Sequence, residues 1–500
     1  MTLGRRGERL AIAVAVGVAV VVVSRLVSPS SEYVAGPIAG GLVHTLPTRL
    51  LTWTIATLGE YAGTLFSLSA AALAVALFGA VTLAGLWAVD RLDDSVSVPP
   101  AVAISVAVAA VAFVLTDSAV HAIGLGFVGG TVGWLGGRID RKSVSPDSWS
   151  RREILTAIGG GTLFGVGALA ANAGSNETRP ELSLSSRTRR EIDALSDVAA
   201  ENGLDIPGLP GLLTPIGEFY VVDINIDPPA VDAEEWAVTI GGAVDTELRL
   251  TRDRLDLFDP VTELLTLRCI GEELNGTLMS TAVWTGVPIA SLLDRAGPDG
   301  GYARLTGADR YSEVVPIEML SDAILVYAMN GRALPRQHGF PARVIVPGSW
   351  GKVNVKWLTG IEILTEREDG FWSQWEGTSP VNTVAKLWNA RPTDGGMEVS
   401  GHAYAGDREV EAVEVSTDGG ETWHGATLSD PLPHPATWRQ WRYEWRPDGD
   451  SAEVVVRAID GEGERQTEAF SEPKPDGATG WVSRRVDTTT TTDFTRGYRG

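Results

Sequence analysis

Cysteine and lysine are the two residue types that this chain has least of. Its 500 residues include one cysteine, Cys269, and five lysines. A single thiol excludes an internal disulfide, a zinc site with several cysteine ligands and a Cys-x-x-Cys redox pair. A lone cysteine is most often a small buried apolar residue. If Cys269 has a chemical role, it acts alone, as a nucleophile or as a thiolate ligand to a soft metal.

Basic side chains are also scarce, and the imbalance is confined to the C-terminal part. The chain has 41 Lys and Arg against 63 Asp and Glu. Residues 1–171 hold 11 basic and 10 acidic residues, which leaves residues 172–500 with a net charge of about −23. Such a surface repels phosphates, so nucleic acid is excluded as a partner. An acidic, lysine-poor surface is typical of proteins that work in high salt, where screening removes the self-repulsion.

Long apolar runs fill the N-terminal third. Five of them are long enough to span a bilayer, at 10–27, 64–89, 98–116, 119–135 and 154–171. The weaker segment 41–59 contains Pro47 and Arg49, and we interpret it as interfacial or re-entrant. Basic residues precede the first run, follow the second and lie between the last two. Five spans therefore place the N-terminus in the cytoplasm and all residues after 171 on the extracytoplasmic face of the cell membrane.

Two features of this region bear on export and electron transfer. Ser150–Leu155 (SRREIL), followed by three glycines at Gly159–Gly161, resembles a twin-arginine export signal, although a positive flank of a membrane span explains it equally well. The histidines His44 and His121 could ligate a haem. Isolated histidines in helical bundles more often make structural hydrogen bonds, so haem is not expected.

Composition divides the rest of the chain into four parts, so the predicted fold is multi-domain. Residues 172–209 are polar and predict a stalk with one helix near 190–202. Residues 210–378 mix short β-rich runs with helical stretches, which predicts an α+β domain. Residues 379–486 alternate strands with Asp-Gly and Gly-Gly turns and predict an immunoglobulin-like β-sandwich. The remaining residues, 487–500, predict a disordered tail.

Within the α+β part, the predicted elements are short. Strands are expected at 219–226, 236–240, 264–269, 303–305, 342–346, 353–357 and 361–365, and helices near 289–296 and 317–322. These strands and helices follow no regular alternation, which favours an α+β domain.

Four phrases in this part contain cysteine, histidine, arginine, asparagine and lysine. They are LLTPIGEFY at Leu212–Tyr220, TLRCIGEELNG at Thr266–Gly276 followed by VWTGVP at Val283–Pro288, MNGRALP at Met329–Pro335 running into HGFPARVIVPG at His338–Gly348, and GKVNVKWL at Gly351–Leu358. In this order they resemble the sulfite oxidase family of molybdopterin-dependent oxidoreductases. STDGGETW at Ser416–Trp423 and RAID at Arg457–Asp460 resemble the same family's C-terminal dimerisation domain. The resemblance covers about residues 205–485.

The resemblance implies that the Cys269 thiolate ligates molybdenum and that a molybdenum–molybdopterin cofactor carries the chemistry. By family position, the cofactor contacts would be Tyr220, Cys269, His338, Arg343, Lys352, Asn354 and Lys356. Lys352 and Lys356 fall within five residues of each other in a chain that has five lysines, which fits a pterin phosphate held by fixed cations. Taken singly, each of these residues could equally be a surface charge or a satisfied polar group in the core.

The chain departs from sulfite oxidases proper where a substrate anion would bind. Those enzymes carry arginines soon after the cysteine, whereas here Gly271 is followed by Glu272 and Glu273. We expect two carboxylates beside the metal to disfavour a sulfite dianion. The pattern is closer to the prokaryotic branch that includes periplasmic sulfoxide reductases. Asp223, Asn225 and Glu272 are predicted to line the substrate pocket.

The leading interpretation is a membrane-anchored molybdoenzyme that transfers an oxygen atom, with two electrons, at the sulfur centre of a small substrate. No cytochrome domain is recognisable in the sequence, so electrons would pass through a separate partner or the membrane. The β-sandwich could form a homodimer. One alternative is a cofactor-free scaffold or adhesion module, which would not need Cys269 and its basic partners. A cysteine hydrolase, with His338 and Asn354 as partners of the nucleophile, is a third reading.

Overall fold

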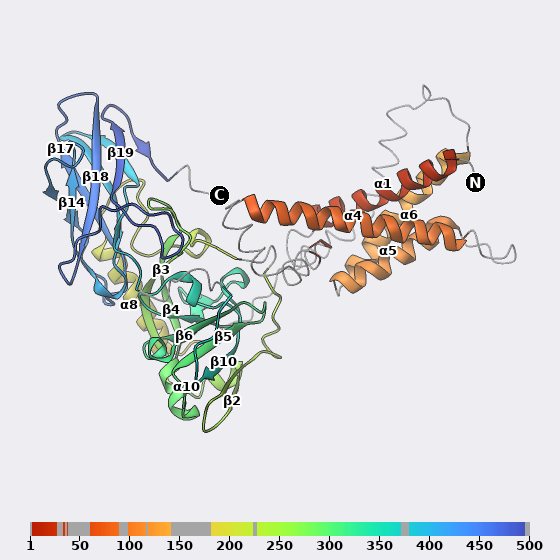
Figure 1. Ribbon diagram of the computed structural model, residues 1–500, viewed down its shortest axis with the longest axis horizontal. Coiled ribbons are helices and arrows are strands. Elements are labelled where there is room, and N and C mark those ends of the chain that lie inside the picture. Colours follow the sequence, from red (N-terminus) through yellow and green to blue (C-terminus); the bar gives the residue numbers. More distant parts are fainter. Residues whose placement is uncertain are drawn as a thin grey trace. The chain divides into compact units, whose positions relative to one another are not determined.

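The described chain divides into two units, one helical and one rich in strands (Figure 1). The computed structural model describes residues 3–27, 34–35, 38, 61–89, 99–116, 119–141, 182–223, 228–371 and 380–495. The first unit comprises residues 1–179 with 223–228, and the second comprises 180–222 with 229–500. Each unit has its own buried core.

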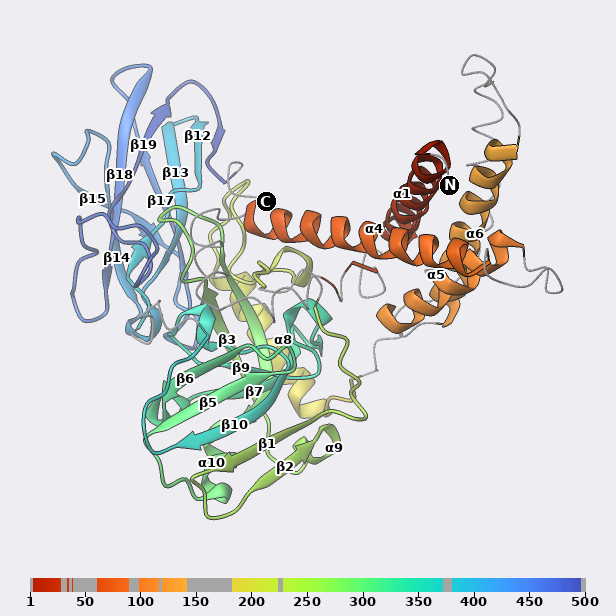
Figure 2. The ribbon, with the colours of Figure 1, turned by 45° about the vertical axis from the view of Figure 1, so that its right-hand side comes forward.

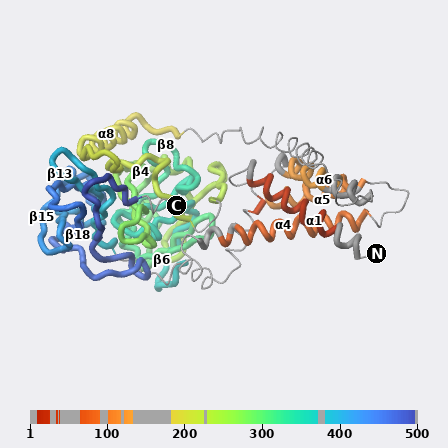
Figure 3. Tube along the Cα trace, turned by 90° about the horizontal axis from the view of Figure 1, so that it is seen from above, coloured from red at the N-terminus to blue at the C-terminus, as the bar shows by residue number. Residues whose placement is uncertain are grey.

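The described residues of the first unit form four long helices. They are α1 (Leu3–Val27), α4 (Tyr61–Val89), α5 (Pro100–Thr116) and α6 (Ala119–Arg141). Helix α1 packs against α4 and α6, and α5 also packs against these two helices (Figure 3). Gly126 lies so close to α5 that a Cβ there would fall 2.7 Å from the Ser105 carbonyl oxygen. Small residues thus allow close approach of the backbones.

Four of the five predicted apolar runs coincide with these helices. Among the described residues, one helix is long and apolar enough to cross a membrane, over Leu68–Val89, and two shorter apolar helices span Ala101–Thr116 and Ala122–Val132. The fifth run, the segment 41–59 with His44, and the twin-arginine-like motif lie outside the described residues. His121 lies in α6.

Two sheets build the first part of the second unit. One has the order β2-β1-β10-β5-β6, with β2 Leu248–Thr251, β1 Ala237–Gly242, β10 Leu358–Leu364, β5 Tyr302–Gly307 and β6 Ser312–Pro316 (Figure 2). The other has the order β3-β4-β7-β8, with β9 also on β7, and comprises β3 Val261–Arg268, β4 Met279–Pro288, β7 Ile324–Met329, β8 Arg332–Ala333 and β9 Arg343–Ile345. Pairing is antiparallel except between β1 and β10. The predicted α+β arrangement is present.

Short helices connect these strands. They are α9 (Arg252–Leu255), α10 (Ile289–Ala296), η2 (Ile216–Glu218), η3 (Ile317–Leu320), η4 (Arg336–His338) and η5 (Gly351–Val353). Helix α10 follows the buried strand β4 and presents Ile289, Leu292 and Leu293 to the core between the sheets. It ends at Gly297, whose positive φ of 64° is the left-handed conformation that glycine adopts without strain.

Helix α8 (Ser186–Asn202) belongs to this unit and is not part of a free stalk. The Ser185 hydroxyl caps it by accepting the Thr188 N–H at 3.1 Å. Its buried face contains Ile192 and Ala199, which share a core with residues of β3 and β4. The sequence predicted that this domain starts at residue 210, but the second unit begins earlier in the chain.

The C-terminal part is a β-sandwich. One sheet has the order β16-β17-β13-β12-β20, with β11 on β13: β16 Thr427–Leu428, β17 Arg439–Trp445, β13 Gly396–Tyr404, β12 Asn389–Thr393, β20 Thr492–Asp493 and β11 Val384–Ala385. The other has the order β15-β14-β18-β19: β15 His424–Gly425, β14 Val410–Ser416, β18 Ser451–Asp460 and β19 Val482–Asp487. Alternate residues of both sheets fill one shared core.

Three details of the sequence-based prediction are wrong. Residues 353–357 form no strand: η5 ends at Val353, and Trp357 has a positive φ of 50°, which a pleated strand does not accommodate. Residues 219–223, the described part of another expected strand, lie outside the sheets. Residues 487–495 are ordered, because β20 pairs with β12.

Candidate functional site

Cys269 lies immediately after β3, where the chain leaves the sheet. Its N–H donates to the Leu278 carbonyl at 3.0 Å, and its carbonyl accepts the Glu272 N–H at 3.2 Å. These bonds close a segment that we call the Cys269 loop, residues 269–278. The thiol is half-buried. Burial raises its pKa to about 11, against the opposing effect of the cations Arg268 and Lys386. A thiol with this pKa is protonated at neutral pH and is a poor nucleophile, whereas metal coordination deprotonates a thiol outright.

Glu272 lies in a buried ion triad. Arg268 Nε donates to Glu272 Oε2 at 3.0 Å, and Lys386 Nζ forms an ion pair with Glu272 Oε1. The side chains of Arg268 and Lys386 are 0% exposed and that of Glu272 is 1% exposed. Two cations thus outweigh one carboxylate, and Glu273 is exposed to solvent. This corrects the expectation of two carboxylates that repel an anion.

Tyr220 reaches the cysteine from a distant part of the sequence. A Cβ added to Gly351 would lie 3.1 Å from the Tyr220 hydroxyl and 3.5 Å from the Cys269 Cα. Burial, and the nearby charge of a Cys269 thiolate, raise the pKa of Tyr220 well above its ordinary value. The structure thus brings together Tyr220, Cys269 and Gly351, as the resemblance implied for the first two.

His338 and Arg343 form a second buried group. The backbone of η4 holds His338, and Arg343 Nη1 donates to the His338 carbonyl at 3.3 Å. Burial, together with Arg343 and Lys356, lowers the pKa of His338 to about 3, so its ring is neutral at pH 7. Within the described chain, Nε2 of this buried ring has no hydrogen-bond partner. A buried polar atom without a partner is costly, and it indicates a site that a ligand completes.

Asn354 supports this group through its backbone. Its carbonyl accepts Arg343 Nη2 at 2.7 Å. Its side-chain Oδ1 accepts the Val346 N–H at 2.7 Å, and its Nδ2 lies 3.4 Å from the Trp350 carbonyl. The amide side chain is thus engaged with the neighbouring backbone, and direct contact with a cofactor stays a prediction.

Lys352 and Lys356 are close in the sequence but contact different groups of residues. Lys356 Nζ donates to the Val222 carbonyl at 3.0 Å and to the Gln337 carbonyl at 3.2 Å. Lys352 Nζ lies 3.6 Å from Glu313 Oε2, with both side chains almost fully buried. The charge of Lys352 is therefore largely compensated by Glu313. The sequence-based prediction that Lys352 and Lys356 together bind a phosphate did not include this carboxylate.

Tyr311 joins the Lys352 cluster. Its hydroxyl lies at donor distance from Glu313 Oε1, at 3.0 Å, and from the Lys352 carbonyl, at 2.8 Å. Burial raises the pKa of Tyr311 well above its ordinary value, and Glu313 and a Cys269 thiolate act in the same direction. Lys352 directly follows Gly351, the residue beside Cys269, so this cluster is connected to the cysteine along the backbone.

For the two remaining predicted residues, the structure gives no position relative to Cys269. Asp223 is half-buried and belongs to the first unit. Asn225 lies outside the described residues. Their role at a substrate pocket stays a prediction.

Sequence reasoning missed four residues of this region: Arg268, Tyr311, Glu313 and Lys386. One signal was available. Of the five lysines in the chain, three, at positions 352, 356 and 386, lie in this part of the molecule. In a lysine-poor protein, the position of each lysine is informative. Glu313 carries no such signal, because acidic residues are abundant.

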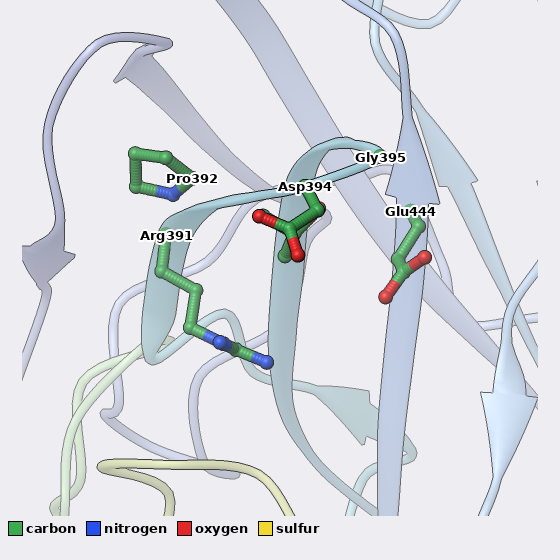
Figure 4. A pocket seen from close by; sticks show the side chains of 6 residues that line it. Arg391, Pro392, Asp394, Gly395 and Glu444 are labelled. Atoms are coloured by element: carbon green, nitrogen blue, oxygen red, sulfur yellow. The ribbon is translucent and has the colours of Figure 1, made fainter.

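One hollow on the described surface lies in the sandwich and is not lined by any of these residues. It has a volume of about 670 Å³ and is lined by Arg391, Asp394 and Glu444 around the β12–β13 turn (Figure 4). Arg391 is already paired with Glu398 at 2.7 Å. A second hollow, of about 370 Å³, adjoins the Cys269 loop at Glu273 and Leu274.

The residues around Cys269 fit a metal-containing cofactor with an anionic group. The thiol is a soft ligand, and among the residues that the structure describes the buried imidazole Nε2 of His338 has no hydrogen-bond partner. Gly339 has a φ of 107°, and a Cβ there would lie 3.1 Å from Arg343 Cβ and 3.2 Å from Lys356 Cβ. The lack of a side chain allows the Gly339 backbone to approach Arg343 and Lys356 closely.

Comparison with known protein families matches both parts of the second unit. Residues 225–372 match the oxidoreductase molybdopterin binding domain. Residues 379–471 match the Mo-co oxidoreductase dimerisation domain. The first match corresponds to the α+β part of the second unit, and the second match corresponds to the sandwich.

Curated relatives share these regions. Nitrate reductase [NADH] 2 of Phaseolus vulgaris is 31% identical over 291 residues, which cover 44% of this chain and 32% of the relative. Mitochondrial sulfite oxidase of Mus musculus is 29% identical over 308 residues, covering 50% and 56%. Sulfite oxidase of Gallus gallus is 28% identical over 346 residues, covering 58% and 73%. The chain therefore spans about a third of the length of the nitrate reductase and about half of the length of the Mus musculus sulfite oxidase.

A solved structure, the sulfane dehydrogenase SoxCD from Paracoccus pantotrophus, aligns with a TM-score of 0.49 and 21% identity, over 65% of this chain and 96% of that one. Both family domains occur in the expected order, and residues of two further resembling phrases, Tyr220 and Gly351, lie beside Cys269. This chain belongs to the sulfite oxidase family of molybdopterin-dependent oxidoreductases.

Proposed function

We propose that this enzyme catalyses a two-electron oxygen-atom transfer at the sulfur centre of a small substrate, with Cys269 as the protein ligand of molybdenum. The observation that carries the proposal is the position of the lone thiol at the end of β3, beside Tyr220 and backed by two buried cations. Bound there, molybdopterin would supply the metal-centred redox chemistry. In the reducing direction, the substrate loses one oxygen atom as water and consumes two electrons and two protons.

The protein side chains bind and orient the cofactor. His338 is neutral at pH 7 because burial and the neighbouring cations lower its pKa to about 3, so Nε2 can serve as a hydrogen-bonding atom without adding charge. Arg343 and Lys356 provide fixed cations for the anionic group. Asn354 holds the guanidinium of Arg343 through its backbone carbonyl.

Either a sulfoxide or a sulfur oxyanion is compatible with the charges near Cys269. The sequence alone favoured a neutral sulfoxide because of Glu272. In the structure that carboxylate is neutralised by Arg268 and Lys386, so it gives no reason to exclude an anion. The substrate therefore has to be decided by assay.

The decisive experiment is elemental analysis of the purified full chain combined with assays of sulfite oxidation and sulfoxide reduction on the same preparation. We expect about one molybdenum per chain and turnover of one substrate class. A folded protein from a cofactor-producing host that contains no molybdenum would refute the proposal.

We further propose that the helical unit anchors the enzyme in the membrane with its catalytic unit outside. Large apolar side chains are exposed on all four helices, among them Leu68 at 65% and Val114 at 82%, while small residues occupy the contacts between helices. Such a surface is suited to lipid. Protease added to intact cells should cleave the catalytic unit if this orientation is right, and should leave it intact if it is cytoplasmic.

Electron exchange and assembly complete the proposal. The match to a dimerisation domain supports a homodimer formed through the sandwich. The catalytic chemistry needs a separate electron-transfer partner or a membrane electron carrier. Analytical ultracentrifugation in detergent tests the dimer, and reduction by isolated membranes tests the electron source.

A further inference from the structure

Lys386 is a buried cation to which the proposed catalysis assigns no role. It follows β11 at the start of the sandwich, and its side chain is 0% exposed. Its ammonium group forms an ion pair with Glu272 and donates to the Gly276 carbonyl at 2.9 Å. Both partners lie in the Cys269 loop. A sandwich side chain therefore reaches the segment that carries the metal ligand.

Neighbouring contacts connect the same two segments. Asn275 Nδ2 donates to the Leu387 carbonyl at 2.8 Å, and Asn275 Oδ1 accepts the Leu387 N–H at 2.9 Å. Arg268 Nη1 donates to the Asn382 carbonyl at 2.8 Å. The contacts begin at the residue before Cys269 and end at Gly276. We call these contacts, between residues 268–276 and 382–387, the loop clamp.

The composition of the Cys269 loop explains why a polar clamp is needed. Its central residues are Gly-Glu-Glu-Leu-Asn-Gly, and only Leu274 among these six offers a large apolar side chain for packing. Two glycines give the backbone wide conformational freedom. These six residues offer little apolar surface, so hydrogen bonds and ion pairs supply most of what fixes them, in addition to the packing of Leu274 and of the preceding Ile270.

Stability alone does not account for three buried charges. Desolvation of a buried ion pair often cancels its Coulomb attraction, so well-packed apolar residues would stabilise the fold equally well. Burial lowers the pKa of Lys386 to about 8 against the opposing effect of Glu272, which reflects this desolvation. The contacts of the triad instead converge on one functional loop.

We propose that Lys386 is a positioning residue through which the sandwich holds the Cys269 loop in the geometry that binds the metal. The loop clamp makes the metal ligand dependent on the second domain of the same chain. This inference rests on the proposed role of Cys269 as a ligand, but the order of the loop can be measured without metal.

The first test is amide hydrogen exchange of the full chain in detergent, prepared without cofactor, for the wild type and Lys386→Met. We expect exchange in residues 269–278 to accelerate by about tenfold or more, with strands β13 and β17 unchanged. The matched control is Arg391→Met, which breaks the Arg391–Glu398 pair of the sandwich without touching the loop. It should leave exchange of the loop unaltered.

The second test uses the molybdenum-loaded enzyme. Lys386→Met should lower kcat by about tenfold or more while KM changes by less than about twofold, because a misplaced ligand affects the reacting centre more than substrate binding. The electron paramagnetic resonance signal of the one-electron-reduced metal should also change. Arg391→Met should alter neither measurement.

Two results would overturn the inference. If Lys386→Met lowers the melting temperature but leaves loop exchange and kcat unchanged, the triad is only a structural contact between domains. If the single variant does not fold, Glu272→Gln with Lys386→Gln removes the pair without leaving one buried partner charged, and unchanged loop exchange in that double variant would equally refute it. The two proposals can fail separately. If Lys386→Met disorders the loop but the wild-type protein never binds molybdenum, the positioning role of Lys386 is supported and the proposed function is refuted.

Discussion

At the scale of single residues, the Cys269 thiol is the group on which the proposed chemistry depends. We predict that Cys269→Ser abolishes molybdenum binding and turnover, because a serine hydroxyl is a poor replacement for a soft thiolate. The melting temperature should change by only a few degrees, since the side chains are similar in size and the loop bonds of Cys269 involve its backbone. Elemental analysis and a thermal melt measure the two effects. Retention of one metal per chain would contradict the assignment.

Buried histidines give the second prediction. Burial lowers the pKa of His402 to about 3, and that of His338 likewise. Below pH 6.5 the unfolded chain binds protons that the folded chain does not. The contribution of these two histidines to stability is therefore constant above about pH 6.5 and falls by about 1.4 kcal/mol per pH unit for each histidine as the pH drops toward 3.

The variant His402→Gln isolates one of these contributions. It should lose stability at pH 7, because the His402 ring packs against two tryptophans. Its centroid lies 4.8 Å from the ring centroid of Trp388 and 4.0 Å from that of Trp438. Its stability should, however, fall less steeply between pH 6 and 4, by about 1.4 kcal/mol per pH unit. Denaturant titrations at several pH values measure the slope. His424→Gln, at an exposed position, is the control and should keep the wild-type slope.

The sequence phrases selected candidate side chains for the site but did not predict the charges around them. Tyr220 and Cys269 were assigned from separate phrases, and the fold places both beside Gly351. Glu272 was judged by its own charge, because its partner Lys386 is more than 100 residues away in the sequence and belongs to another domain. Long-range pairing of this kind leaves no local pattern, so the electrostatics of the site required the structure.

At the scale of elements, helix α8 is a structural support for the strands that carry the site. Its buried residue Ala199 lies in the core that includes Leu264 and Val283 of β3 and β4. We predict that Ala199→Asp destabilises the second unit by about 3 kcal/mol or more, because it buries an unpaired carboxylate. Ala194→Asp makes the same substitution at an exposed position of α8 and should be nearly neutral. Equal melting temperatures for the two variants would show that α8 does not contribute to the core.

Hydrophobic periodicity located most strands but failed where function constrains the backbone. Residues 353–357 alternate apolar and polar side chains, as a strand does, yet they include η5 and the positive φ of Trp357. This irregular path places Asn354 against Arg343 and directs Lys356 to the Gln337 carbonyl. A regular strand would face successive side chains to opposite sides. The local pattern therefore misled at the segment that builds the site.

At the scale of the whole molecule, charge and hydropathy divide the chain in the same way as the structure does. The helical unit is nearly neutral, and almost all the excess acidity belongs to the second unit. Composition alone predicted this division. It did not predict that α8 joins the second unit, because a polar helix with a narrow apolar face resembles a linker until its partner strands are known.

The acidity of the second unit leads to the last prediction. A net charge of −22 on the full chain, with five lysines to offset it, repels itself in the compact state and less so in the expanded unfolded state. Salt should screen this repulsion, since the Debye length falls from about 30 Å at 0.01 M to about 3 Å at 1 M. We therefore expect the melting temperature to rise by about 5 °C or more between 0.01 M and 1 M KCl. Sucrose at equal osmolality separates screening from solute exclusion, because it carries no charge and should give a smaller rise. A melting temperature that stays level or falls as KCl increases would mean that paired charges, such as Arg304 with Glu362 and Glu368, already neutralise the surface.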